Sequence, residues 1–286
     1  MSQLLTLAVP SSARARTLAT SRGSFAAFDM APDDSVSHRG TVLMVPGFMG
    51  SKEDFLPMLP ALSRAGYRVV SIDGRGQHET GGSHPLAAYA REELARDLVA
   101  VVEAVGDGPV HLLGHSYGAL LARTAVLQTE GDPSLWRSLT LMNFGPAGVS
   151  DQQRERLNLL LSVIDAMTLE EIWPFLEGQD ETISDEVHTF MRARWLANDL
   201  HHIKAAADQL ISEPDRTDTL TAVRLPKAVV SGSPDATWAP EGVARMANVL
   251  SARLIALPGG GHSPNVHRPE ESATGLTDFW DSLTRP

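Results

Sequence analysis

The segment that most restricts the fold of this chain is GHSYG, residues 114–118, which stands between an apolar run and a helix-like segment. The run Pro109–Leu113 predicts a strand, and Ala119–Gln128 predicts a helix. A serine between two glycines at such a junction needs a tight, strained turn, and the glycines remove side chains that would clash. The following helix directs its N-terminal N–H groups toward developing negative charge. The pattern predicts that Ser116 is a nucleophile, and a structural glycine-rich turn is the alternative.

Strands and helices alternate on both sides of this segment. Thr41–Pro46 and Tyr67–Ile72 are short and almost wholly apolar, which is typical of strands buried on both faces of a parallel sheet. Alternation at this spacing indicates right-handed βαβ units. The expected strands are Arg16–Thr20 and Ser24–Met30 (paired at a sheet edge), Thr41–Pro46, Tyr67–Ile72, Pro109–Leu113, Leu139–Asn143, Lys227–Ser231 and Ala252–Leu257. The expected core helices are Asp54–Ala65, Ala87–Val105, Ala119–Gln128 and Glu270–Leu283.

Residues 149–219 contain only helix-like segments. We call them the helical insertion and expect an α/β core, formed by residues 1–148 and 220–286, that it interrupts. The alternative is that these helices belong to one continuous core. The expected helices of the insertion are Gln152–Met167, Leu169–Leu176, Ser184–Ala197 and His201–Ile211.

A serine hydroxyl needs a neighbouring base to become nucleophilic. The best candidate is His262, because it ends the glycine run at residues 259–262 directly after the strand Ala252–Leu257. Loops at the carboxyl ends of parallel strands present functional groups. We expect His115 to point away from the turn and His111 to pack within its strand. The other histidines are expected in solvated stretches or a surface turn, with 201 and 202 pointing apart: His38, His78, His84, His188, His201, His202 and His267.

The base needs an acceptor that fixes its tautomer. Asp235 follows the strand Lys227–Ser231 and gives the chain order Ser116, Asp235, His262. The loop after the preceding strand is the other place for the acid, but Asn143 stands there and cannot carry the charge. Asp235 is therefore the predicted acid, with an ordinary Pro-Asp turn as the alternative.

A tetrahedral intermediate also needs N–H donors. The predicted donors are the backbone N–H groups of Tyr117, directly after the serine, and of Phe48, in the glycine-containing loop after the strand Thr41–Pro46. Apolar side chains near these motifs could line a substrate pocket, although aromatic residues at helical spacing usually form the core of their own subdomain. The pocket candidates are Phe48, Met49, Tyr117, Phe144 and Trp238 beside the motifs, and Trp173, Trp195, Phe175 and Phe190 in the insertion.

Charge and composition narrow the partners. With 24 Lys+Arg against 35 Asp+Glu, the net charge of −11 argues against nucleic acid and anionic membranes as partners. We expect no transmembrane helix and no secretory signal, because no apolar stretch reaches about 18 residues and the arginines follow the first apolar run. The absence of cysteine excludes disulfides and thiol catalysis and fits a cytoplasmic protein. A small-molecule substrate is expected, and the oligomeric state is open between monomer and homodimer.

These motifs together resemble those of the α/β-hydrolase superfamily over nearly the whole chain outside the insertion. VPGFMGS (45–51) is similar to its oxyanion loop, SIDGRGQ (71–77) to the segment after the next strand, and GHSYG to its nucleophile elbow; SGSPDATWAP (231–240) and GGGHSPNVHRPE (259–270) resemble its acid and histidine loops. The resemblance implies an α/β-hydrolase fold, with a mostly parallel central sheet flanked by helices and the insertion as a cap over the active site. Two positions depart from the common pattern: Pro46 replaces a histidine and His78 a glycine. Ser116 disfavours the members with an aspartate nucleophile, the epoxide hydrolases and haloalkane dehalogenases.

The predicted chemistry is two-step acyl transfer on a small or medium, largely apolar carboxylic ester, without metal or organic cofactor. Ser116 attacks the carbonyl, His262 takes its proton, Asp235 steadies the imidazolium, and water then releases the acid. The same residues could serve C–C bond, lactone or amide hydrolysis or cofactor-free perhydrolysis. These motifs are also compatible with a biosynthetic thioesterase and with a small-molecule binding protein that has vestigial catalysis.

Overall fold

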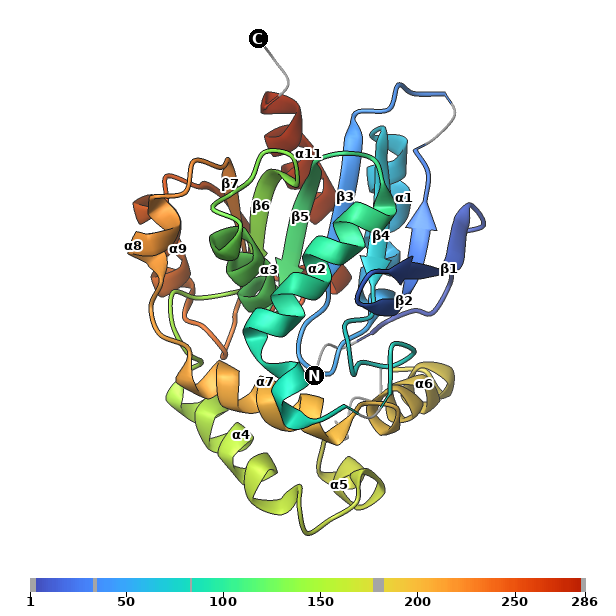
Figure 1. The fold of residues 1–286 in the computed structure, drawn as a ribbon, viewed down its shortest axis with the longest axis vertical. Helices are drawn as coiled ribbons and strands as arrows, with labels where there is room; N and C mark the ends of the chain where they lie inside the picture. Colours follow the sequence, from blue (N-terminus) through green and yellow to red (C-terminus); the bar gives the residue numbers. More distant parts are fainter. Residues whose placement is uncertain (1–3, 33–34, 83, 177–182, 284–286) are drawn as a thin grey trace.

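An eight-stranded sheet forms the centre of the computed structural model, which describes residues 4–32, 35–82, 84–176 and 183–283 (Figure 1). The strand order is β1-β2-β4-β3-β5-β6-β7-β8. β1 and β2 pair antiparallel, β2 also pairs antiparallel with β4, and all other pairs are parallel, which confirms the predicted mostly parallel sheet. The strands are β1 (Ala13–Thr20), β2 (Gly23–Met30), β3 (Gly40–Val45), β4 (Tyr67–Ile72), β5 (Val110–His115), β6 (Trp136–Met142), β7 (Lys227–Ser233) and β8 (Arg253–Pro258).

Helices cover both faces of the sheet. Alternate residues of β3 enter different clusters: Leu43 and Val45 pack with α2 and α3, and Val42 and Met44 pack with α1 and α11. This burial on both faces explains why the strand is almost wholly apolar. The core helices are η1 (Lys52–Met58), α1 (Leu59–Arg64), η2 (Leu86–Tyr89), α2 (Arg91–Val105), α3 (Tyr117–Gln128), α8 (Thr217–Thr221), α9 (Pro240–Val249), α10 (Pro264–His267) and α11 (Pro269–Ser282).

Several helix boundaries differ from the predictions. The helix predicted from residue 54 is a 3₁₀ helix, η1, followed by α1, because Pro57 has no N–H for an α-helical ladder. The helix predicted from residue 87 begins at Arg91, after the short turn η2 that follows Pro85. Helices α8, α9 and α10 were not predicted; in α9 the buried residues Val243, Met246 and Ala247 have helical spacing that could have revealed it.

The described residues between Met142 and α8 contain helices as their only regular elements: α4 (Asp151–Val163), α5 (Leu169–Leu176), α6 (Asp185–Leu196) and α7 (Leu200–Ser212). Figure 1 shows them gathered beyond one end of the sheet. That end is the carboxyl end of β5, because the Tyr117 hydroxyl just after it donates to Gln209 of α7 at 2.9 Å. The helical insertion therefore lies at the sheet edge where the predicted functional loops emerge.

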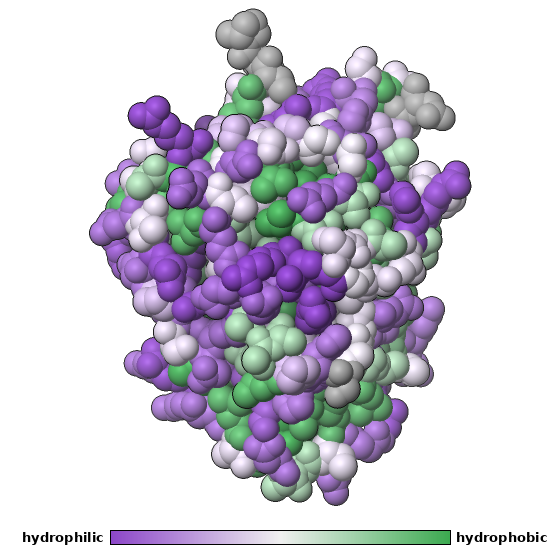
Figure 2. Space-filling model, viewed as in Figure 1, coloured by the Kyte–Doolittle hydropathy of each residue, from purple (hydrophilic) through white to green (hydrophobic). Residues whose placement is uncertain are grey.

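The insertion is fixed to the core by buried polar contacts. Arg123 of α3 donates to the carbonyl oxygen of Pro146, where the chain leaves the core, and to the carboxylate of Glu213, where it returns. Arg194 of α6 forms an ion pair with Asp54 of η1 at 2.6 Å, with both side chains fully buried. Figure 2 shows hydrophobic side chains on the visible face of the insertion. Two large apolar residues of the insertion, Leu159 and Phe175, are exposed. No helix in the described ranges combines the length and apolarity needed to cross a membrane.

Candidate active site

Ser116 lies at the turn between β5 and α3 with φ of 52°, in the left-handed region that side chains rarely adopt. The flanking glycines make this turn possible. A Cβ on Gly114 would lie 2.3 Å from the carbonyl oxygen of Gly118, and one on Gly118 would lie 2.3 Å from that of Val45. The turn therefore requires glycine at both positions, and it holds the serine in a strained conformation that the sheet and helix impose.

Ser116, His262 and Asp235 form one chain of hydrogen bonds. The Oγ atom of Ser116 lies 3.1 Å from Nε2 of His262, whose Nδ1 lies 3.0 Å and 3.1 Å from the two carboxylate oxygens of Asp235. With Nδ1 donating to the carboxylate, Nε2 is left to accept the serine proton. The three loops thus meet as the sequence order suggested. The His262 side chain is 30 % exposed, so this histidine is reached by solvent.

The carboxylate of Asp235 is buried and ionised. Burial opposes its charged form, but hydrogen bonds from His262, from the N–H of Thr237 and from the side chain of Asn143 outweigh it and hold the pKa of Asp235 below its ordinary value. The negative charge is therefore available to orient His262 and to stabilise its protonated form.

Asn143, which the sequence analysis excluded as the acid, contacts the acid, and this contact was not predicted. It follows β6 with φ of 43°, and its amide nitrogen donates to Asp235 Oδ2 at 3.0 Å and to the carbonyl oxygen of Gly261 at 2.9 Å. Its amide oxygen accepts from the N–H of Gly232 at 2.9 Å. One side chain thus ties the loop after β7 to the loop after β8. Its position directly after a parallel strand was the signal that could have identified it.

His115 was also given no role beside His262. Its Nε2 lies 2.8 Å from the carbonyl oxygen of His262, and the two rings are 5.2 Å apart. Burial lowers the pKa of His115 to about 3, so the ring is neutral and Nε2–H can donate to that carbonyl. The residue before the serine therefore supports the loop that carries the histidine.

The loop after β3 passes close to Ser116. A Cβ on Gly47 would lie 3.3 Å from the Cβ of Ser116 and 3.2 Å from Nδ1 of His115. The next residues, Phe48 and Met49, are buried, and Met49 has φ of 56°. The N–H of Tyr117, the first residue of α3, belongs to the residue directly after Ser116. The two predicted donors therefore belong to segments adjacent to the serine, one in space and one in sequence.

The pocket candidates beside the motifs lie at different distances from His262. Trp238 stacks on His262 with ring centroids 6.1 Å apart, and Phe144 packs edge-on behind it, under the guanidinium of Arg123. The Tyr117 side chain is buried beneath α7, against Gln209 and the ring of His202. Of the candidates beside the motifs, Trp238 is thus the one with a ring contact to His262.

The aromatic residues of the insertion have other neighbours. Trp195 is buried and donates to the carbonyl oxygen of Leu169, and Trp173 packs on His188, so both lie in the insertion's own core. Phe175, another pocket candidate of the insertion, is 80 % exposed. Phe190 packs edge-on against His78. For Trp173 and Trp195, helical spacing thus marked the core of their own subdomain.

The expectation of solvated histidines was wrong for His202, which is buried against Tyr89 and Tyr117; burial lowers its pKa to about 4. His201 and His202 point apart, and His111 is buried in β5, as expected. Of the histidines that were expected to be solvated, His38 alone is exposed in the described part of the chain. The others are half-buried: His78, His84, His188, His201 and His267. His267 lies within α10 and not in a surface turn.

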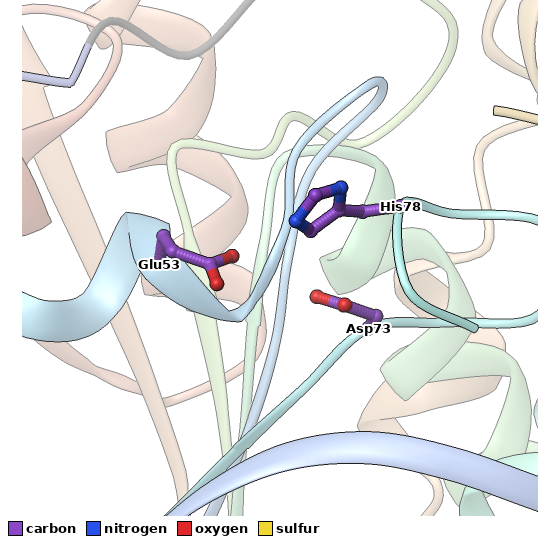
Figure 3. Close-up of side chains that lie close together, drawn as sticks. All are labelled: Glu53, Asp73 and His78. Carbon is purple, nitrogen blue, oxygen red and sulfur yellow. The ribbon is translucent and has the colours of Figure 1, made fainter. Parts of the chain in front are cut away.

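A cluster of charged side chains, most of them buried, includes the residues that directly follow the loop after β3. In Figure 3 the side chains of Glu53, Asp73 and His78 turn toward one another, with possible ligand atoms within 4.8 Å. The ammonium group of Lys52 already lies 2.9 Å from Glu53 and 3.1 Å from Asp73. Asp73 also accepts the backbone N–H groups of Lys52 and Glu79. The lysine thus supplies the positive charge that a metal ion would bring, so this donor set fits an ammonium-centred cluster.

The comparisons agree with this fold. The model of the alpha/beta hydrolase family matches residues 42–274. The chain is 29 % identical over 258 residues to a putative carbamate hydrolase RutD of Variovorax paradoxus, covering 86 % of this chain and 93 % of that protein. It is 37 % identical to epoxide hydrolase B of Mycobacterium tuberculosis over 83 residues, 29 % of this chain and 23 % of that protein. A bromoperoxidase from Bacillus anthracis has a TM-score of 0.75 at 18 % identity, covering 94 % of this chain and 100 % of that one, which shows the shared fold.

Proposed function

The chain belongs to the alpha/beta hydrolase family, and we propose that it is a serine hydrolase that cleaves an acyl compound through a covalent acyl-enzyme. The observation that carries the proposal is the hydrogen-bonded chain of Ser116, His262 and Asp235, with distances of 3.1 Å and 3.0 Å. A nucleophile, a base and an orienting carboxylate in this order are what acyl transfer requires.

The reaction proceeds in two steps. His262 Nε2 takes the Ser116 proton as Oγ attacks the carbonyl carbon, and the N–H groups of Phe48 and Tyr117 bind the oxyanion that forms. Protonated His262 gives the proton to the leaving alcohol, which departs and leaves an ester on Ser116. Water then attacks that ester, with His262 again as base, and the acid leaves as Ser116 regains its proton.

The proposed substrate is a small or medium carboxylic ester with a largely apolar acyl group. Trp238 beside His262 and the apolar side chains of Phe48 and Met49 in the neighbouring loop support an apolar lining. An organic carbamate is the second candidate, because relatives named putative carbamate hydrolases match 84–86 % of this chain. A carbamate offers the same carbonyl to the serine, with a nitrogen substituent on one side.

Epoxide opening is disfavoured. The epoxide hydrolase relative aligns over 83 residues only, and the proposed nucleophile of this chain is a serine. If the Ser116 oxygen opened an epoxide, it would form an ether. An ether has no carbonyl for water to attack, so the second step could not release the enzyme. The substrate of this site is therefore proposed to carry a carbonyl.

A fluorophosphonate probe tests the nucleophile. We expect intact mass to show one adduct on the wild type and none on Ser116→Ala. A series of p-nitrophenyl esters of increasing acyl length, with p-nitrophenyl carbamates beside it, then identifies the substrate class. An adduct with negligible turnover of both series would favour C–C bond hydrolysis or another specialised acyl substrate. Absence of the adduct would refute the proposal and favour a small-molecule binding protein.

A further inference from the structure

Gln77 is a buried amide in the loop after β4, at 2 % exposure. Its Nε2 donates to the carbonyl oxygen of Gly47 at 2.8 Å, and its Oε1 accepts from the N–H of Gly74 at 3.0 Å. Its backbone is also held, since its N–H donates to the carbonyl of Gly74 and its carbonyl accepts from the N–H of Thr80. Both ends of the side chain are thus engaged from a fixed backbone.

The carbonyl that Gln77 binds belongs to the same peptide group as the N–H of Phe48. A trans peptide is planar, so its C=O and N–H point in opposite directions, and fixing one fixes the other. The Gly47 side of this peptide lies against Ser116, as the 3.3 Å approach of a built Cβ shows. The orientation of the Phe48 N–H therefore depends on what holds the Gly47 carbonyl.

Two donors hold that carbonyl. The N–H of Gly50 bonds to it at 3.0 Å, but this bond closes a turn within the same loop and moves with it. Gln77 is different because it reaches the carbonyl from another loop. That loop is anchored to β2, where Thr80 Oγ1 accepts the N–H of Ala26, and to the helical insertion, where the N–H of Asp199 donates to Gly76.

We propose that Gln77 is a positioning residue that aims the Phe48 N–H at the oxyanion. The inference rests on the proposed function, because it assigns Gln77 to the same acyl-transfer site. The amide donates to the carbonyl side of the peptide, which also polarises the N–H and strengthens it as a donor. Gln77 touches neither substrate nor Ser116, so it acts through the peptide between Gly47 and Phe48.

Two variants and one control test this role. Gln77→Met keeps the length of the side chain without polar atoms, and Gln77→Glu keeps an acceptor for the Gly74 N–H but loses the donor. Thr80→Val is the matched control, because it removes an anchor of the same loop and leaves the Gly47 carbonyl untouched. Fluorophosphonate titration counts active sites first, so that each rate is given per folded site.

We expect both Gln77 variants to lose kcat by about 10- to 100-fold, somewhat less than the loss of a whole oxyanion donor, with KM changed less than about twofold. A trifluoromethyl ketone forms an oxyanion when Ser116 adds to it, so its affinity falls by the same factor as kcat/KM. Thr80→Val lowers the unfolding temperature and leaves the kcat and ketone affinity of its folded sites near those of the wild type.

The outcomes separate the positioning role of Gln77 from the serine hydrolase function. If the Gln77 variants react with the fluorophosphonate and keep wild-type kcat and ketone affinity, the positioning role is overturned and the serine hydrolase function stands. The same conclusion follows if Thr80→Val loses as much kcat and ketone affinity as the Gln77 variants do, or if neither Gln77 variant yields soluble protein, since Gln77 then serves the fold. A wild type without a Ser116 adduct would overturn the proposed function and this inference together.

Discussion

Nε2 of His115 lies 2.8 Å from the carbonyl oxygen of His262, so the residue before the candidate nucleophile supports the candidate base. Ser116 and His262 are 146 residues apart in the sequence, and they are joined both directly and through this neighbouring bond. The distance between Oγ and Nε2 is therefore set in part by a neutral, buried histidine that takes no proton in the reaction.

The first prediction concerns this support. His115→Phe removes the donor, and we expect kcat to fall about fivefold, which corresponds to about 1 kcal/mol for one hydrogen bond, while KM stays within twofold. His115→Gln can place an amide nitrogen near the former Nε2 and should recover most of the rate. Steady-state kinetics on an ester substrate measures both. Equal rates for the two variants would show that the hydrogen bond has no part in positioning His262.

The second prediction concerns Asn143, whose amide donates to Asp235. Asn143→Asp replaces this donor with a second carboxyl group that faces Asp235 and the carbonyl oxygen of Gly261, so one of the two carboxyl groups must keep a proton. We expect kcat to fall about 10-fold, because Asp235 loses a hydrogen bond that favours its ionised form. Asn143→Ala removes the same hydrogen bonds without adding a carboxyl group and should lower kcat less. Steady-state kinetics on an ester substrate measures both variants, and equal kcat values for the two would show that the added carboxyl group does not disturb Asp235.

The third prediction concerns the buried ion pair between Arg194 of the insertion and Asp54 of η1. Arg194→Met leaves the buried carboxylate of Asp54 without its guanidinium, and we expect a loss of about 3–5 kcal/mol in the free energy of unfolding. Adding Asp54→Leu removes that charge and should restore part of the loss. Urea denaturation measures both proteins. If the double variant is less stable than Arg194→Met, the charge that Asp54 keeps in Arg194→Met is not the cause.

The fourth prediction is acid sensitivity. Burial lowers the pKa of His111 and His115 to about 3 and that of His202 to about 4, against about 6.5 in an unfolded chain. Below pH 6.5 the unfolded chain binds protons that the folded protein does not. Stability is therefore complete above that pH and falls, by about 1.4 kcal/mol per pH unit for each histidine, as the pH drops toward 4.

Replacing one of these histidines should flatten that dependence. In His111→Phe the ring can still pack between Tyr67 and Trp280, and the slope of unfolding free energy against pH should fall by about one proton. His38→Gln changes an exposed histidine and serves as the control. Urea denaturation between pH 4.5 and 7 gives the slopes. A slope in His111→Phe equal to that of the wild type would show that His111 does not contribute to the loss of stability in acid.

Sequence patterns predicted the fold because its elements are marked locally. The apolar run of β4 was located to the residue, and the glycines around Ser116 identified the turn at the end of β5. Ser116, Asp235 and His262 could be selected because each follows a strand of a parallel sheet, whose carboxyl ends meet at one edge. Their assembly followed from topology and needed no knowledge of side-chain contacts.

The supporting residues could not be predicted in the same way. Gln77, His115 and Asn143 form hydrogen bonds to partners 30, 147 and 92 residues away in the sequence, and no local pattern identifies those partners. Their neighbours in space depend on the twist and register of the whole sheet. The buried His202 was misjudged although its helix is amphipathic: His202 lies on the buried side of α7, together with Ile203 and Ala206, and faces Tyr117.

Arg123 joins the two points where the chain leaves and re-enters the core, through the carbonyl of Pro146 and the carboxylate of Glu213. Because the Arg123 side chain holds both points, it keeps the two ends of the intervening chain together whatever helices that chain contains. The entropic cost of closing a longer loop grows only with the logarithm of its length. Evolution can therefore lengthen, shorten or replace the helices over the sheet edge, and so redesign what is admitted there, while the residues beneath keep their geometry.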